Sequence, residues 1–305
     1  MKRLPSAERY TAILLTALAL LTALPAFAQV DFSGNWITKA FEEQPERGPG
    51  PHIGDYMGLP INDATRKRGD SWSAEKLEMV ERQCQQPAAD YAPRGPSMLR
   101  MWSVVDPTTQ AVVSWQSLLR FMLPHRILYM DKRPHPPEWA PHTWQGFSTA
   151  EWDGDALKIK TTHLREGWIR RNGLARSEKA TMTEYLVRNG DYLTLYAIID
   201  DPVYLTEPLV RSTDWKYDLG TQIIPNECIY SVETEHPRGW VPHYLPGKNQ
   251  WLHEWSDITG IPYEAMRGGG ETMYPEYQKK MARMPVPPPR TNEEVKEAVK
   301  EAVEE

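Results

Sequence analysis

Apolar and polar residues alternate along the middle of the chain with the two-residue period of half-buried β-strands. The clearest pairs of such segments are residues 147–152 with 156–162, and residues 179–187 with 192–200. An Asp-Gly turn at residues 153–155 joins the first pair, and an Asn-Gly turn at residues 189–190 joins the second. Because such turns need positive φ angles, these dipeptides between alternating segments predict two β-hairpins.

Further apolar segments extend this pattern into an all-β domain. Strands are predicted at Trp36 and at residues 111–119, 125–131, 203–215 and 222–235. With the two hairpins this gives about eight strands, which is enough to close a small barrel with room for one ligand. The predicted fold class is therefore mainly β, an antiparallel β-barrel with short C-terminal helices.

Helical patterns and breakers lie on both sides of the strand region. Residues 42–70 are rich in Pro, Gly and charge and predict an extended connector, followed by a short helix at residues 73–83. Residues 249–259 have apolar side chains at helical spacing before Gly260, Pro275 can open another helix, and residues 291–305 begin with a capping box.

The N-terminal segment has the three-part layout of a secretory signal peptide. Lys2 and Arg3 precede the apolar residues 12–24, and Ala26-Phe27-Ala28 supplies a small-x-small cleavage site. We therefore expect three segments: a signal peptide (1–28), a barrel (29–248) with its connector at 42–70, and a helical extension (249–305). The mature protein would begin at Gln29, be periplasmic or secreted, and have no stable membrane insertion.

Composition narrows the partner classes. The formal net charge is −6, and removal of residues 1–28, which contain three basic side chains and one acidic one, makes the remainder more acidic. An acidic chain argues against nucleic acid and anionic membranes as partners. Aromatic residues are mainly Trp (12) and Tyr (14) against 5 Phe, and their polar handles suit either a wet pocket or an ordinary core and rim.

Cys84 and Cys228 are the two cysteines of the chain. An exported protein can keep a disulfide, and both residues lie in irregular surroundings, so we predict that they pair. The alternative is two buried thiols that never meet.

Phe32-Ser33-Gly34-Asn35-Trp36 contains the Gly-x-Trp element found on the first strand of lipocalin-like barrels. Further along, the chain resembles a large family of uncharacterised secreted bacterial proteins. The resemblance rests on Tyr129-Met130-Asp131-Lys132-Arg133-Pro134-His135-Pro136, Gly146-x-Ser148, Trp152-x-Gly154-Asp155-x-Leu157, Thr161-Thr162, Glu184 and Asp201-Pro202-x-Tyr204. The resemblance implies a lipocalin-like (calycin-type) antiparallel β-barrel and export, and it implies no reaction. Where the family often has His inside its Gly-x-Ser element, this chain has Phe147.

Four histidines fall in the strand region: His125, His135, His142 and His163. Imidazole can bind metals or move protons near neutral pH, but the common ligand spacings (His-x-His, HExxH, Cys-x-x-Cys) are missing from the sequence, so no metal or other cofactor is predicted. His135 and His142 lie in a Pro-rich loop that could form the rim of a barrel mouth. The alternative is a surface loop whose histidines cap backbone groups.

Glu184 lies between Met182 and Leu186 on the same face of a predicted strand. A carboxylate on an apolar face is costly unless it is paired. Two interpretations follow: a buried ion pair with Arg100, Arg120 or Arg126, or an acid–base group with a raised pKa.

The function best suited to this pattern is the binding of a small, partly apolar molecule inside an exported barrel. The candidate ligand contacts are Trp36, Arg100, Trp102, Trp115, Arg126, His135, His142 and Tyr204. One alternative is an acid–base enzyme (a hydratase, isomerase or hydrolase) with His125, His163 and Glu184 as catalytic residues. A second is an envelope interaction module with an apolar patch around Trp251 and Trp255.

Overall fold

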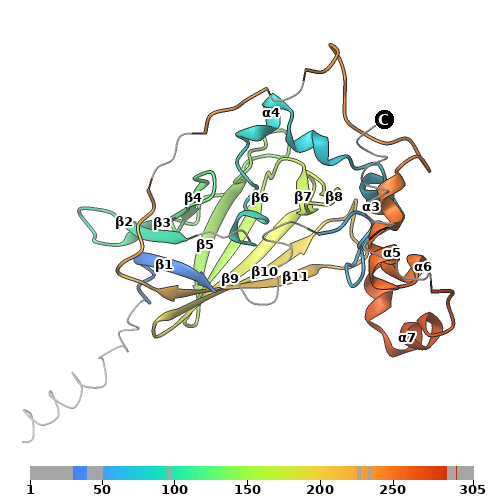
Figure 1. Ribbon diagram of the computed structural model, residues 1–305. Helices are drawn as coiled ribbons and strands as arrows, with labels where there is room; N and C mark the ends of the chain where they lie inside the picture. Colours follow the sequence, from blue (N-terminus) through green and yellow to red (C-terminus); the bar gives the residue numbers. More distant parts are fainter. Residues whose placement is uncertain are drawn as a thin grey trace, which may run out of the picture. The chain divides into compact units, whose positions relative to one another are not determined.

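Nine strands close into a barrel in the computed structural model, which describes residues 30–39, 51–94, 98–224, 228–232, 235–286 and 293 (Figure 1). Their order around the barrel is β1-β11-β10-β9-β6-β5-β4-β3-β2. Their bounds are β1 (Gly34–Lys39), β2 (Leu99–Val105), β3 (Val112–Leu119), β4 (His125–Tyr129), β5 (Phe147–Asp153), β6 (Ala156–Thr162), β9 (Thr181–Asn189), β10 (Tyr192–Asp200) and β11 (Leu209–Tyr217). This confirms the predicted mainly β fold with a closed barrel, whose strands are mostly antiparallel.

The two predicted hairpins are present as β5–β6 and β9–β10. Gly154 and Gly190 have φ angles of 60° and 58°, as the turn chemistry requires. The pairing of β4 with β5 is parallel, because residues 130–146 cross from one end of the barrel to the other between these strands.

The prediction of a strand at residues 222–235 is wrong for the described part of that range, which contains no strand. Its apolar residues belong to an irregular segment after β11, in which Ile224, Ile229 and Val232 are exposed. The barrel reaches nine strands without it because residues 99–105, which were not assigned a strand of their own, form β2.

Several elements pack around one end of the barrel. A separate hairpin consists of β7 (Gly167–Arg170) and β8 (Leu174–Arg176), and helix α3 (Asp63–Asp70) contacts β8. Helix α3 corrects the prediction of an extended connector over residues 42–70, because Asn62 caps it by accepting hydrogen bonds from two of its backbone N–H groups. The helix predicted at 73–83 is interrupted at Met79, whose ψ of 132° separates η1 (Ala74–Leu77) from α4 (Val80–Gln83).

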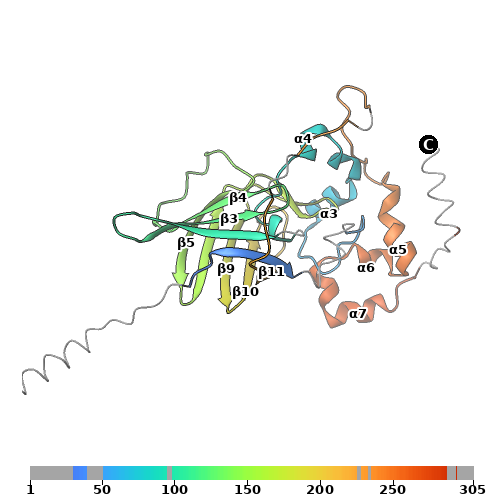
Figure 2. The ribbon, with the colours of Figure 1, turned by 60° about the vertical axis from the view of Figure 1, so that its left-hand side comes forward.

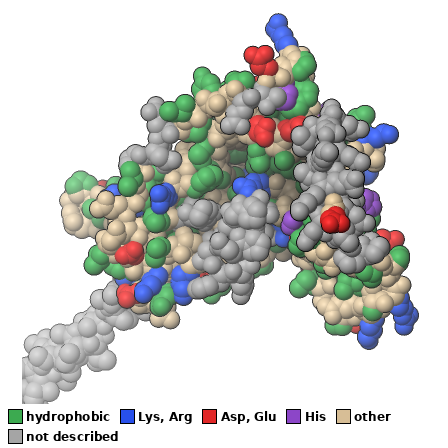
Figure 3. Space-filling model, viewed as in Figure 1, with side chains coloured by type: hydrophobic (Ala, Val, Ile, Leu, Met, Phe, Trp, Pro, Cys, Tyr) green, Lys and Arg blue, Asp and Glu red, His purple; other side chains and the backbone are tan. Residues whose placement is uncertain are grey.

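The predicted C-terminal helices are short and consecutive (Figure 2). They are η3 (Gln250–His253), α5 (Glu254–Thr259), α6 (Tyr263–Met266), η4 (Gly270–Met273) and α7 (Pro275–Met281). Gly260 ends α5 with a φ of 72°, and Pro275 opens α7. Basic side chains gather at the outer end of this extension, where α7 ends with Lys279 and Lys280 (Figure 3). The helix predicted at 291–305 falls outside the described residues apart from Glu293.

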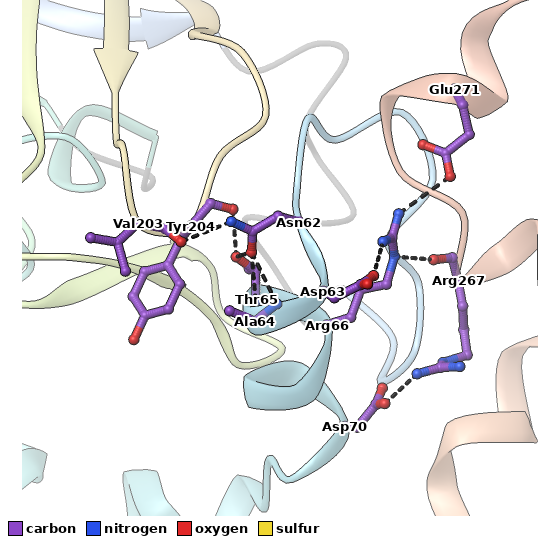
Figure 4. Close-up of polar contacts among 10 residues, drawn as sticks. All are labelled: Asn62, Asp63, Ala64, Thr65, Arg66, Asp70, Val203, Tyr204, Arg267 and Glu271. Carbon is purple, nitrogen blue, oxygen red and sulfur yellow. Dashed lines mark hydrogen bonds and ion pairs between the residues drawn. The ribbon is translucent and has the colours of Figure 1, made fainter.

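A polar network joins α3 to the barrel and to the C-terminal extension (Figure 4). Asn62 Nδ2 donates to the carbonyl of Val203 (2.8 Å), in the loop between β10 and β11. On the other side of α3, Arg66 Nε donates to the carbonyl of Arg267 (3.1 Å), and the Arg267 guanidinium pairs with Asp70. The extension is thereby fixed to the same end of the barrel as α3.

Contacts divide the chain into two compact units, Met1–Asp31 and Phe32–Glu305. The segment interpreted as a signal peptide lies in the first and outside the described residues. The barrel and the helices after residue 248 belong to the second. Among the described residues, no helix combines the length and the apolar character needed to cross a bilayer.

Candidate functional site

Arg126 on β4 and Glu184 on β9 meet inside the barrel. Arg126 Nη1 donates to Glu184 Oε1 (3.0 Å), and Nη2 donates to Oε2. The Glu184 side chain is fully buried and that of Arg126 is 10% exposed. The alternation that directs Met182 and Leu186 inward therefore also directs Glu184 inward, and of the three arginines considered as its partner, the closed barrel selects Arg126.

Two hydroxyl groups complete this polar cluster. Arg126 Nε donates to Ser148 Oγ (3.1 Å), and Nη2 also donates to Thr161 Oγ1 (2.6 Å). Ser148 and Thr161 are themselves hydrogen-bonded (2.9 Å) and face each other across the β5–β6 pair. Neither residue was identified from the sequence as part of the site. The available signal was that each is a polar residue at an inward-facing position of a strand whose other inward-facing residues are apolar. The cluster satisfies a charged group that would be costly to bury alone.

A cavity of about 40 Å³ lies against this cluster, between the barrel wall and the segment that covers the mouth. Its walls are mainly aliphatic and aromatic, and Arg126 is the charged residue among them. The lining residues are Ala89, Ala92, Pro93, Leu99, Met101, Ser117, Leu119, Pro124, Arg126, Leu128, Gln145, Ile159, Leu186, Leu195 and Trp215. The space is therefore apolar with one cationic donor group at its edge.

Residues 85–94, which we name the cap, contribute Ala89, Ala92 and Pro93 to the lining of this cavity. The cap follows Cys84, whose disulfide to Cys228 (Cα–Cα 5.7 Å) confirms the predicted pairing. Within the cap, the backbone N–H of Ala89 donates to the carbonyl of Trp144 (2.9 Å). Asp90 pairs with Arg176 of β8 at 3.1 Å, and both side chains are fully buried. The cap was missed in the sequence because the contacts that hold it to Trp144 and Arg176 are distant along the chain.

The opposite end of the barrel is filled by aromatic rings. Trp36 is fully buried, its indole N–H donates to the carbonyl of Phe32 (3.1 Å), and Arg188 lies 5.1 Å from its ring centre. Trp115 packs edge-on against Phe32 at a centroid distance of 5.3 Å. Trp36 and Trp115, both expected to contact ligand, are absent from the lining of the cavity and pack this end of the barrel instead.

Three other predicted site residues lie together on the outer wall of β2–β4. The rings of Trp102 and His125 stack at 5.5 Å, and His125 Nε2 is 2.7 Å from Gln116 Oε1. The Arg100 guanidinium lies 5.8 Å from the Trp102 ring centre. Alternation explains this placement, because the strand neighbours Leu99 and Met101 are the residues that point inward.

His135 and His163 lie on the outside of the barrel and share one hydroxyl group. His135 contacts Thr162 Oγ1 through Nδ1 (2.7 Å) and Thr149 Oγ1 through Nε2 (2.9 Å). His163 contacts the same Thr162 hydroxyl through Nδ1 (2.8 Å) and the carbonyl of Pro137 through Nε2 (3.0 Å). Because a carbonyl only accepts, the contact of His163 Nε2 with Pro137 requires a proton on that nitrogen.

This histidine chain anchors the loop of residues 130–146. His142 is 3.0 Å from the carbonyl of Leu164 through Nδ1, and its ring lies 5.1 Å from that of His163. Burial, with smaller contributions from Lys160 and His163, lowers the pKa of His135. The loop in turn holds the cap through Trp144 and through Gln145, whose side chain donates to the carbonyl of Pro87 (2.9 Å).

The last predicted contact, Tyr204, serves the scaffold through its backbone. Its carbonyl accepts from the hydroxyl of Thr65 (2.5 Å) in α3 and from the backbone N–H of Asn62 (3.1 Å). In the described part of the chain, no group of three or more His, Cys, Asp or Glu side chains is arranged to hold a metal ion.

Comparison with known proteins adds little to this description. No family model matches the chain, and no curated protein matches it. Among solved structures, the chain is similar to the fluorescent protein UnaG, at 8% identity and a TM-score of 0.27, over 61% of this chain and 97% of that one. A similarity this low carries no functional argument, so function must be inferred from the site itself.

Proposed function

We propose that the barrel binds a small, partly apolar molecule at its mouth, in the space that the cap closes. The observation that carries this proposal is the apolar cavity bounded by Ile159, Trp215 and Ala92, with the Arg126 guanidinium at its edge. Ligand sites are typically concave and apolar, with a few polar groups that orient the guest. A nine-stranded barrel is wide enough for side chains and one small ligand.

The cap must move for a guest to enter. A cavity of about 150 Å³ is needed to hold a molecule of the size of benzene, whereas the closed cavity has about 40 Å³. Ala89, Ala92 and Pro93 form its cover, so displacement of the cap enlarges the space without repacking the strands. In this proposal the described structure is the state without a guest, and the cap lies further from the strands when a guest is bound.

The arrangement of the side chains does not favour the alternative of an acid–base enzyme. Its catalytic candidates are separated by the barrel wall, because Glu184 lies inside it while His125 and His163 make their hydrogen bonds outside it. Glu184 is already engaged by Arg126 through both carboxylate oxygens. The interaction module is not taken forward either: Trp255 stacks on His52 at 3.9 Å, and Trp251 donates to Tyr244 (3.1 Å).

Export to the periplasm or the medium, with Gln29 as the mature N-terminus, is part of the same proposal. The charged, apolar and small-residue segments before Gln29 support it, and so does the Cys84–Cys228 disulfide, since disulfides persist in oxidising compartments. N-terminal sequencing of the secreted or periplasmic fraction tests this point, and an intact Met1 there would refute it.

Binding beneath the cap can be tested with the neutral probe N-phenyl-1-naphthylamine. We expect its fluorescence to rise on binding and the emission of Trp215, which lines the cavity, to fall. Ala92→Leu places three extra carbon atoms in the cavity and should weaken probe binding at least tenfold. Ala282→Leu, the same change at an exposed position after α7, is the matched control. Equal probe affinity in both variants would refute the proposed site.

A further inference from the structure

We propose that the guest of this cavity is an uncharged molecule with one hydrogen-bond acceptor, such as a ketone, aldehyde or ester oxygen. This inference rests on the proposed function and names the ligand class of the same site. It follows from the state of Arg126, the charged residue in the cavity lining, whose charge is already matched by Glu184 in a two-point ion pair.

An anionic guest does not suit this arrangement. A carboxylate beside Arg126 would leave two negative groups, the guest and Glu184, facing one guanidinium inside the barrel. Glu184 is fully buried and cannot turn to water, so one of the two anions would remain unmatched. Burying an unmatched charge is strongly unfavourable. A cationic guest does not suit the site either. It would lie beside the positive charge of Arg126, and the carboxylate of Glu184 that could match its charge is already paired with Arg126.

The remaining hydrogen-bonding capacity of Arg126 is that of a donor. A guanidinium has five N–H bonds and no acceptor. The described contacts use four of them: one from Nε to Ser148, one from Nη1 to Glu184, and two from Nη2 to Thr161 and Glu184. These contacts leave the second N–H of Nη1 without a partner in the described structure, and we take it as the donor to an acceptor atom of a guest. The aliphatic and aromatic walls then accommodate an apolar remainder.

The ligand class can be tested by displacing the bound probe with three molecules of equal chain length. These are 2-octanone, which is neutral with one acceptor, octanoate, which is anionic, and octylammonium, which is cationic. We expect 2-octanone to displace N-phenyl-1-naphthylamine at a concentration at least tenfold below that of either ion. If octanoate or octylammonium displaces it equally well or better while Ala92→Leu still weakens probe binding, the site is correct and the inferred ligand class is wrong. If Ala92→Leu leaves probe binding unchanged, the proposed function itself has failed.

A charge-changing variant tests the physical cause. Glu184→Gln removes the charge that matches Arg126, so octanoate should gain at least tenfold in affinity relative to 2-octanone. Glu151→Gln, at an exposed position on β5, should leave the ratio unchanged. The double variant Arg126→Met/Glu184→Leu keeps the interior apolar and should bind 2-octanone no better than 1-octene, which has no acceptor. The inference would be overturned if Glu184→Gln left the affinity of octanoate relative to 2-octanone unchanged, or if the double variant still bound 2-octanone more tightly than 1-octene.

Discussion

Asp90 and Arg176 form an ion pair in which both side chains are fully excluded from solvent, and this pair joins the cap to the β7–β8 hairpin. A second buried ion pair among the described residues is that of Arg126 with Glu184 inside the barrel. The first holds the cover of the cavity, and the second forms part of its wall. The proposed binding site is therefore bounded by charges that are matched within the chain.

Removal of Asp90 should destabilise the closed cap. Asp90→Ala leaves Arg176 buried without its partner, which typically costs about 3–5 kcal/mol. We expect a large fall in the free energy of unfolding by urea, together with faster hydrogen exchange of residues 85–94. Arg68→Ala, which breaks the exposed pair with Glu166, should change stability by less than about 1 kcal/mol. Equal effects of the two variants would contradict the role assigned to Asp90.

The Arg126–Glu184 pair should behave as a structural unit. Glu184→Gln leaves the Arg126 charge unmatched and should lower the free energy of unfolding by about 3–5 kcal/mol. Replacing both residues, as in Arg126→Met/Glu184→Leu, removes the charges together and should recover most of that loss. Thermal melts of the three proteins measure this difference. If Glu184→Gln were as stable as the unmodified protein, the ion pair between Arg126 and Glu184 would not contribute to stability.

The cap should also depend on its covalent tether. Cys84 and Cys228 are 144 residues apart in sequence, so in the chain-entropy model their disulfide contributes about 5 kcal/mol, with measured values often lower. Cys84→Ser/Cys228→Ser should therefore lower stability by about 2–5 kcal/mol. It should also speed probe entry, because the cap loses the anchor at Cys84, directly before its first residue. Stopped-flow mixing with the probe measures the rate of probe entry. An unchanged rate would show that the disulfide does not restrain the movement of the cap.

The loop of residues 130–146 should loosen in mild acid. Since the pKa of His135 is lowered in the folded protein by burial, Lys160 and His163, the unfolded chain takes up the proton first as the pH falls. The contribution of neutral His135 to stability is thus complete above the unfolded pKa of about 6.5 and is lost below it. Between pH 7.5 and 5.0, the unmodified protein should lose more stability than His135→Gln, which does not titrate. Parallel pH profiles would contradict this interpretation.

The local part of the fold was predictable, and the reason is turn chemistry. Gly154 and Gly190 determine their hairpins through residues next to them in sequence, and strict alternation gave the inward direction of Glu184. The choice of Arg126 as its partner was not predictable, because β4 and β9 come together only when the barrel closes. Three arginines were equally acceptable before that closure.

The cap and the histidine loop show the limit of local patterns. Residues 85–94 have no periodicity, and their role comes from distant contacts with Trp144 and Arg176. His135 was expected to contact ligand, but the parallel pairing of β4 with β5 carries the loop over the outer wall, where Thr149 and Thr162 bind it. No local sequence pattern in residues 130–146 distinguishes a connection between two parallel strands from the loop of an antiparallel hairpin.

The position of a bound guest tests ligand binding beneath the cap most directly. Crystals of the protein soaked with 8-bromo-2-octanone should give an anomalous bromine signal inside the barrel, with the ketone oxygen within hydrogen-bonding distance of Arg126 Nη1. Residues 89–93 should be displaced from the positions in which they close the cavity. A bromine signal confined to the outer wall, beside Trp102 or His135, with the cap unmoved, would contradict the proposed site.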